Sequence, residues 1–212
     1  MRRRTFVHLA GLTLLAPALA AGWRGEARAQ VQTVDVDGIL KDPDAPTAGN
    51  PKGDVTIVAF LDYNCPFCKK SAPDLARAVK EDGRIRLVYK DWPILTEASV
   101  YGAQLALAAT YQGKYGQVHD ALMAIPGRQI LEAEMLKAIQ ATSVDMDRLT
   151  ADVNGRINDI AALLRRTNAQ ANSLGLKGTP TYLVGPLLAS TLDYASFRRA
   201  IAEARRQQAG AK

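Results

Sequence analysis

The chain has 212 residues, 48% of them hydrophobic, which suits one ordinary domain with a core of its own. Its formal charge of +6 belongs largely to the first 29 residues, which hold five basic residues and one acidic residue. The remaining residues comprise 22 basic and 20 acidic ones, a net charge of +2, which gives no electrostatic footprint for nucleic acid. No apolar run is long enough to span a bilayer as a mature helix.

Residues 1–29 are predicted to form a signal peptide that directs the protein to the periplasm. Arg2 to Arg4 give it a positive start, and Ala27-Arg28-Ala29 offers a small-x-small cleavage site. Ala18-Leu19-Ala20 is a competing site, and an uncleaved anchor helix is the alternative to cleavage. The pattern Arg3-Arg4-Thr5-Phe6-Val7 resembles a twin-arginine signal, with an ordinary secretory signal as the other possibility.

The next segments predict a strand–helix–strand unit. Residues 30–54 are polar and rich in proline, which indicates an N-terminal arm with a short strand and a loop. Residues 55–63 are nearly continuously apolar, as in a strand buried on both faces. An amphipathic helix follows and ends at Asp82-Gly83, before a second strand over Ile85 to Lys90. Such a unit is expected to be right-handed, with parallel strands in residues 55–96.

Residues 97–177 are predicted to form a helical insertion. Asp145 is a candidate N-cap, and Asn154-Gly155 indicates a break. A longer helix then continues to Gly175, although Asn168 interrupts its apolar stripe and weakens the prediction for its last turns.

The chain returns to strands in its last part, residues 178–212. Thr181 to Val184 and Leu187 to Ala189 are short strands on either side of a Gly-Pro turn, and Asp193 to Arg206 is an amphipathic helix. The predicted order is therefore β-α-β, helical insertion, β-β-α, an α/β arrangement.

The two cysteines of the chain, Cys65 and Cys68, are candidate catalytic residues. Cys65 is expected at the N-cap of the helix, with Pro66 at the favoured first position. The free amides and the dipole of a helix start stabilise a thiolate, which is the nucleophile in disulfide exchange, and Lys69 should add to this. Cys68 should lie one turn further inward and resolve the mixed disulfide.

Other uses of the two thiols are less well supported. Zinc needs four ligands, and beyond the leader the chain offers no third cysteine and one histidine, His119. A purely structural disulfide closing so small a ring would contribute only about 2 kcal/mol. Binding of Cu(I) by the two thiolates remains an alternative, although no Met-rich or His-rich segment supports it. No metal or organic cofactor is expected.

Two segments, Phe60 to Lys69 and Gly178 to Tyr182, resemble the DsbA-like family of periplasmic thiol–disulfide oxidoreductases, most closely the BdbD-like and suppressor-of-copper-sensitivity C branch. Residues 49–54 and 90–95 are also similar to it. The resemblance implies a thioredoxin fold and a cis Pro180 facing the cysteines. It also implies that substrate contacts Pro66, Phe67 and the Thr179 backbone.

One position departs from that family. Many of its members carry a buried glutamate six residues before the first cysteine, where this chain has Ala59. Asp62 is the nearest substitute as a proton relay, and a solvated turn residue is the alternative interpretation. His119 is interpreted as a surface or capping residue rather than a catalyst.

The sequence thus predicts an exported thiol–disulfide oxidoreductase acting on cysteine-containing exported proteins and recycled by a membrane redox partner. Isomerases related to this family are usually held as oligomers by an N-terminal stalk. The segment from Gln30 to Asp54 has three prolines and few apolar residues, so it cannot supply a long amphipathic helix. A monomer that favours oxidation over isomerisation is therefore expected, with isomerase or reductase as alternatives.

Overall fold

The computed structural model describes residues 34–210, and the predicted signal peptide lies outside them. Strands and helices follow one another along the chain as α1 (Val36–Leu40), β1 (Thr47–Gly49), β2 (Val55–Leu61), α2 (Pro66–Asp82), β3 (Ile85–Asp91), α3 (Glu97–Ala108), η1 (Ala109–Gln112), α4 (Tyr115–Ala124), α5 (Glu132–Gln140), α6 (Met146–Ser173), β4 (Thr181–Val184), β5 (Leu187–Ser190) and α7 (Tyr194–Gly210). Within this range, no helix has the length and apolar character needed to cross a membrane.

The strands form one mixed sheet in the order β1-β3-β2-β4-β5. Strands β2 and β3 are parallel and are joined through α2, whereas β1, β4 and β5 are antiparallel to their neighbours. The central strand β2 is almost entirely buried, which explains why its sequence is apolar at nearly every position. This arrangement confirms the predicted thioredoxin fold with a helical insertion.

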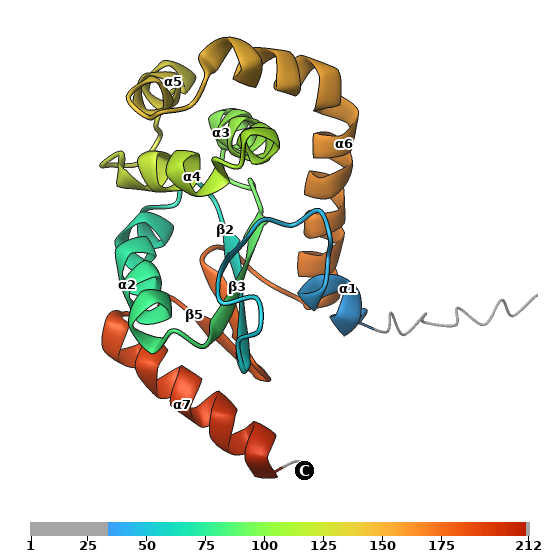
Figure 1. Ribbon diagram of the computed structural model, residues 1–212, viewed down its shortest axis with the longest axis vertical. Coiled ribbons are helices and arrows are strands. Elements are labelled where there is room, and N and C mark those ends of the chain that lie inside the picture. The colour runs from blue at the N-terminus through green and yellow to red at the C-terminus, as the bar shows by residue number, and fades with distance from the viewer. Residues whose placement is uncertain (1–33, 211–212) are drawn as a thin grey trace, which may run out of the picture. The chain divides into compact units, whose positions relative to one another are not determined.

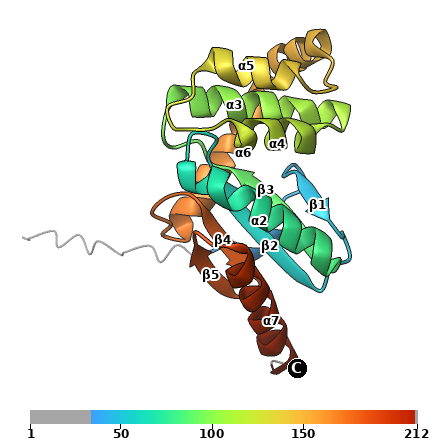
Figure 2. The ribbon, with the colours of Figure 1, turned by 90° about the vertical axis from the view of Figure 1, so that its left-hand side faces the viewer.

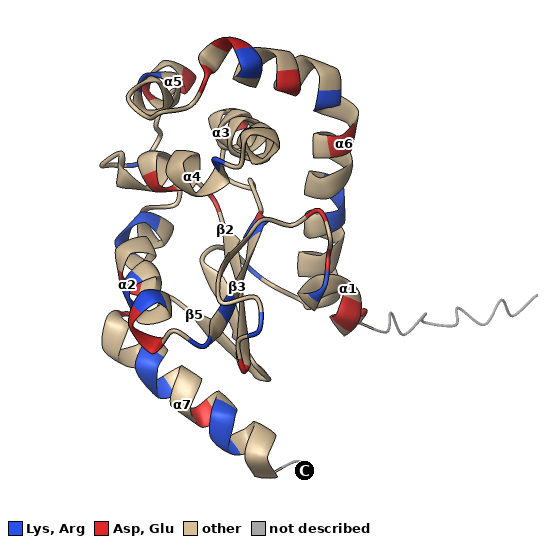
Figure 3. Cartoon of the chain, in the orientation of Figure 1, with Lys and Arg blue, Asp and Glu red and all other residues tan. Residues whose placement is uncertain are grey.

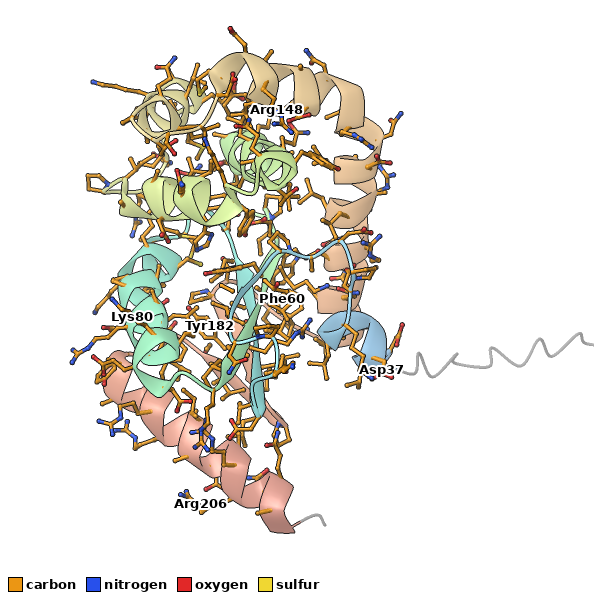
Figure 4. All side chains as sticks on the ribbon, in the orientation of Figure 1. Asp37, Phe60, Lys80, Arg148, Tyr182 and Arg206 are labelled. Atoms are coloured by element: carbon orange, nitrogen blue, oxygen red, sulfur yellow. The ribbon has the colours of Figure 1, made fainter. Side chains whose placement is uncertain are left out.

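The two faces of the sheet have separate cores. Helices α2 and α7 cover one face, where Ile57 and Ala59 of β2 pack with Leu75 and Phe197. On the other face, α1 and the last turns of α6 cover the alternate residues of β2, such as Phe60. Figure 1 shows these helices on opposite sides of β2 and β3, and Figure 4 shows Phe60 and Tyr182 on either side of the strands.

The helical insertion lies over one end of the sheet. Figure 2 shows α3, α4 and α5 gathered above the end at which β2 leads into α2. Helix α6 then runs from this group back along the sheet to α1 (Figure 1). The start of α2 thus lies between the sheet and the insertion. Lysine, arginine and acidic residues are mixed along α2, α6 and α7 (Figure 3).

Two predictions about local structure were wrong. The predicted break at Asn154-Gly155 is absent, because α6 is one helix from Met146 to Ser173. Its N-cap is Asp145, whose side chain accepts a hydrogen bond from the Arg148 amide. The arm over residues 30–54 contains a short helix, α1, before the strand β1, rather than a strand and a loop alone.

A buried ion cluster ties the N-terminal arm to the sheet. Asp42, just after α1, accepts a hydrogen bond from the Lys90 ammonium at 2.8 Å, and both side chains are almost fully buried. Arg166 of α6 binds the same carboxylate at 2.8 Å. Burial raises the pKa of Asp42, but hydrogen bonds from Arg166 and Lys90 outweigh it and lower this pKa to about 2.

Candidate active site

Cys65 is the N-cap residue of α2, where the sequence places it. Its sulfur accepts a hydrogen bond from the Cys68 amide at 3.2 Å, and Pro66 occupies the first helical position. The thiol also lies 3.2 Å from the Thr179 carbonyl oxygen. Both cysteines are buried free thiols in this structure. A helix start, a second cysteine and the loop before β4 therefore converge on one sulfur.

The two thiols have opposite acidities. A hydrogen bond from the Cys68 thiol is the largest factor lowering the pKa of Cys65, and with Thr179 and the helix amides it outweighs burial and brings that pKa to about 6. Burial is the main factor that raises the pKa of Cys68 far above its ordinary value. Near neutral pH, Cys65 is thus the thiolate and Cys68 the protonated partner.

The loop before β4 forms the other side of the site. The Thr179–Pro180 peptide bond is cis, as the family resemblance implied. The Thr179 hydroxyl is buried and has no hydrogen-bond partner among residues 34–210, and the Thr179 side chain also lowers the pKa of Cys65. Phe67, by contrast, projects outward beside the cysteines and is 56% exposed.

Lys69 does not point back to the cysteine. Its ammonium instead reaches the Gly127 carbonyl oxygen in the α4–α5 loop at 3.5 Å. A groove of about 640 Å³ opens beside it, between α2 and α4, starting at Pro66. Its walls are mostly apolar, formed by Ala72 and Pro73 on one side and by residues 123–128 on the other.

Ala59 lies in the middle of the sheet, without an ionisable neighbour on its own strand. It pairs with Tyr89 of β3 on one side and Tyr182 of β4 on the other. The Tyr182 hydroxyl makes a 2.5 Å hydrogen bond with the Ser71 hydroxyl, which in turn donates to the Cys68 carbonyl oxygen. A phenol group from β4 and an alcohol group from α2 thus lie beside the backbone of Cys68.

The interpretation of His119 as a surface or capping residue was wrong. It is 3% exposed, and its Nδ1 atom lies 3.1 Å from the hydroxyl of Tyr63. Burial lowers the pKa of His119 to about 4, so the ring is neutral near pH 7. The packing of α4 against the sheet places this histidine inside, which a pattern of helical spacing alone could not show.

Asp91 is a buried acid that the sequence analysis did not single out. Its carboxylate accepts hydrogen bonds from Tyr115 at 3.1 and 3.2 Å, and burial raises its pKa to about 7. A signal for it was present, because Asp91 ends a strand parallel to the strand that leads to Cys65. Parallel strands end at the same edge of a sheet.

Asp62 is also buried, at 1% exposure, which contradicts the alternative of a solvated turn residue. Its carboxylate binds the amides of Ile94 and Leu95 and the hydroxyl of Ser99. The relay role of Asp62 stays a prediction. Its hydrogen bonds link the loop before Cys65 to the loop before α3.

Comparison with known proteins identifies the family. A family model described as Thioredoxin matches residues 41–203. The chain belongs to the thioredoxin family. The chain is similar to the crystal structure of a thioredoxin-like oxidoreductase from Silicibacter pomeroyi, with 37% identity and a TM-score of 0.75 over 81% of this chain and 98% of that one.

The chain is also similar to the crystal structure of the thiol-disulfide exchange protein α-DsbA2 from Wolbachia pipientis, with 27% identity and a TM-score of 0.73 over 79% of this chain and 90% of that one. These matches confirm the resemblance to DsbA-like members of the thioredoxin superfamily. Among curated proteins, the chain is 28% identical to Na(+)/H(+) antiporter NhaA 3 of Salinispora tropica over 68% of its length. It spans about a fifth of that protein, 22%.

Proposed function

We propose that this protein is a thiol–disulfide oxidoreductase that exchanges disulfides with cysteine-containing exported proteins. The observation that carries the proposal is the pairing of a thiolate at Cys65, with a pKa of about 6, and a protonated, buried Cys68 one turn away. A thiolate near neutral pH both attacks disulfides and leaves readily from them. The inner thiol, within reach of the first sulfur, releases a bound substrate.

In the oxidising direction, a substrate thiolate attacks the Cys65 sulfur of the Cys65–Cys68 disulfide. The bond between the two cysteines breaks, and Cys68 leaves and takes up a proton. A second substrate thiolate then attacks the substrate sulfur of the mixed disulfide and releases Cys65 as a thiolate. Two electrons pass from the substrate dithiol to the protein, which an electron acceptor such as a membrane redox partner must reoxidise.

Trapping of mixed disulfides tests this proposal. A Cys68→Ser variant should accumulate covalent complexes between Cys65 and exported proteins, because the resolving thiol is missing. A Cys65→Ser variant is the matched control, since the buried Cys68 should capture little. Non-reducing gels with and without dithiothreitol would display the complexes. If neither variant forms adducts that dithiothreitol releases, disulfide exchange is not the function.

We also infer that the protein is a monomer that favours oxidation. Support comes from the N-terminal segment, in which α1 has only five residues and packs onto its own sheet through Ile39, which is 1% exposed. Such a segment is unlike a long helical stalk that would hold several domains together. Light scattering, with refolding assays on reduced and on scrambled ribonuclease, tests both points. A stable oligomer that rescues the scrambled substrate better than the reduced one would contradict them.

We propose that the protein is exported to the periplasm and acts there, because disulfides persist in that compartment. Cell fractionation and N-terminal sequencing of the mature protein would test the proposal. We expect a periplasmic protein that begins at Gln30. Retention in the cytoplasm with an intact N-terminus would refute export.

A further inference from the structure

The side chains of Asp62 and Asn64 join the loop that leads to Cys65 to two other loops. The Asp62 carboxylate accepts four hydrogen bonds: Oδ1 binds the Asn64 amide and the Ser99 hydroxyl, each at 2.7 Å, and Oδ2 binds the amides of Ile94 at 2.8 Å and Leu95 at 3.0 Å. An ionised carboxylate has about four acceptor positions, so these contacts occupy its capacity. Through these hydrogen bonds, Asp62 holds the backbone of residues 94–95 and the start of α3 against the loop that leads to Cys65.

Asn64 makes the corresponding contacts on the other side. Its Oδ1 atom accepts a hydrogen bond from the Ile130 amide at 2.6 Å, and its Nδ2 group donates to the Ile130 carbonyl oxygen at 3.2 Å and to the Thr96 hydroxyl at 2.8 Å. Paired contacts to one residue fix both the position and the orientation of that backbone. The segment before α5 is thus held directly beside Cys65.

The two held segments, residues 93–96 and 125–131, carry exposed apolar side chains. Ile94 is 42% exposed, Leu95 49% and Leu131 65%. The amides of Ile94 and Leu95 are bonded to Asp62, and Leu131 follows Ile130, whose amide is bonded to Asn64. Phe67 adds a further exposed ring at the start of α2. Exposed large apolar side chains on segments that are bonded to the loop before Cys65 indicate a binding surface.

The segment over residues 125–131 is also held at its other end and lines the groove beside the site. Lys69 donates to the Gly127 carbonyl oxygen, and residues 125–128 form one wall of the groove that opens at Pro66. A polypeptide joined to Cys65 through a disulfide would extend past these walls. Burial of the exposed apolar side chains against it would contribute to binding in proportion to the area covered.

We propose that Asp62 and Asn64 are positioning residues that hold segments 93–96 and 125–131 as an apolar rim for an extended, cysteine-containing polypeptide. The inference rests on the proposed function and deepens it, since it assigns docking of the substrate to these loops. Their effect falls on the affinity for polypeptides and not on the acidity of the sulfurs.

Kinetics with two substrates test the inference. The oxidised protein is assayed with reduced glutathione, which is too small to span the rim, and with reduced, unfolded ribonuclease. Ile94→Ser and Leu131→Ser should each raise the KM for ribonuclease by roughly fivefold to tenfold relative to the KM for glutathione, because each removes apolar area from the contact. Val36→Ser is the matched control, since Val36 is 55% exposed in α1, across the sheet from α2.

Asp62→Asn tests the positioning role itself. An amide at this position presents an NH₂ group to backbone donors, which should loosen residues 93–96 and raise the same KM ratio, with the Cys65 pKa unaltered. A changed pKa, or an equal loss with both substrates, would show that Asp62 acts on the sulfurs instead. If this variant fails to fold, the Ile94 and Leu131 variants decide, and an unchanged KM ratio in both overturns the proposal. Absence of exchange with either substrate in the unaltered protein would instead refute the proposed function.

Discussion

Changes at Cys68 can separate how much its amide and its thiol each lower the pKa of Cys65. In the unaltered protein, the Cys65 sulfur receives hydrogen bonds from the Cys68 amide, at 3.2 Å, and from the Cys68 thiol. Cys68→Ala removes the thiol but keeps the amide, whereas Cys68→Ser retains a side-chain donor of similar size. The pair therefore separates the effect of the helix start from that of the second cysteine.

The size of the effect follows from the strength of the bond that is lost. A hydrogen bond to a charged group contributes about 1.5–3 kcal/mol, and one pKa unit corresponds to about 1.4 kcal/mol. Cys68→Ala should therefore raise the Cys65 pKa by about one to two units from its value of about 6. The thiolate fraction at pH 7 would fall from roughly nine-tenths to about half or less. Cys68→Ser should raise this pKa less, because its hydroxyl still donates.

The measurement is thiolate absorbance against pH, checked by the rate of alkylation with iodoacetamide. Each variant contains a single cysteine, so the signal belongs to Cys65 alone. Equal pKa values near 6 in the two variants would refute the role of the Cys68 thiol. An ordinary thiol pKa in both variants would refute the contribution of the helix amides.

Three further changes test the surroundings of the site. Asp91→Asn should make the protein more stable relative to the unaltered protein as the pH rises from about 4 to 7, because the folded-state pKa of about 7 makes the folded protein hold a proton at Asp91 that the unfolded chain releases; urea unfolding across this range measures the difference, and a parallel pH dependence in both proteins would contradict it. Ala59→Glu should alter the rate at which a mixed disulfide is resolved more than it alters the Cys65 pKa, as followed by stopped-flow; an unaltered rate would make the missing acid irrelevant. Lys90→Met should cost about 2 kcal/mol of unfolding free energy, because the buried Asp42 carboxylate loses one of its two cationic partners and keeps Arg166, and a second change, Asp42→Asn, should restore part of it; a double variant no more stable than the single one would refute this.

Much of the fold could be predicted from the sequence, because it depends on interactions between residues that are close along the chain. The apolar run of β2 predicts a buried strand because both of its faces are covered, and Gly83 ends α2 in a left-handed conformation that glycine adopts readily. The position of Cys65 at a helix start likewise follows from its neighbours, above all Pro66. These features depend on residues within a turn or two of one another.

The helix α6 shows where local signals fail. Asn154 and Gly155 are poor helix formers, yet the helix continues because Leu149 and Ile160 on either side are anchored in the core. Asn168 interrupts the apolar stripe because its side chain accepts a hydrogen bond from the Trp92 indole, a contact across 76 residues. Such contacts carry no local pattern.

The surroundings of the cysteines were decided by tertiary structure. The sequence by itself determined the redox pair, its place at a helix start and the fold that carries it. It did not show that His119 is buried beside Tyr63, that Asp91 is enclosed, or that Asp62 and Asn64 hold two other loops. The physical reason is that burial and pKa depend on which distant segments cover a side chain. Only the packing of the helical insertion over the end of the sheet brings those segments together.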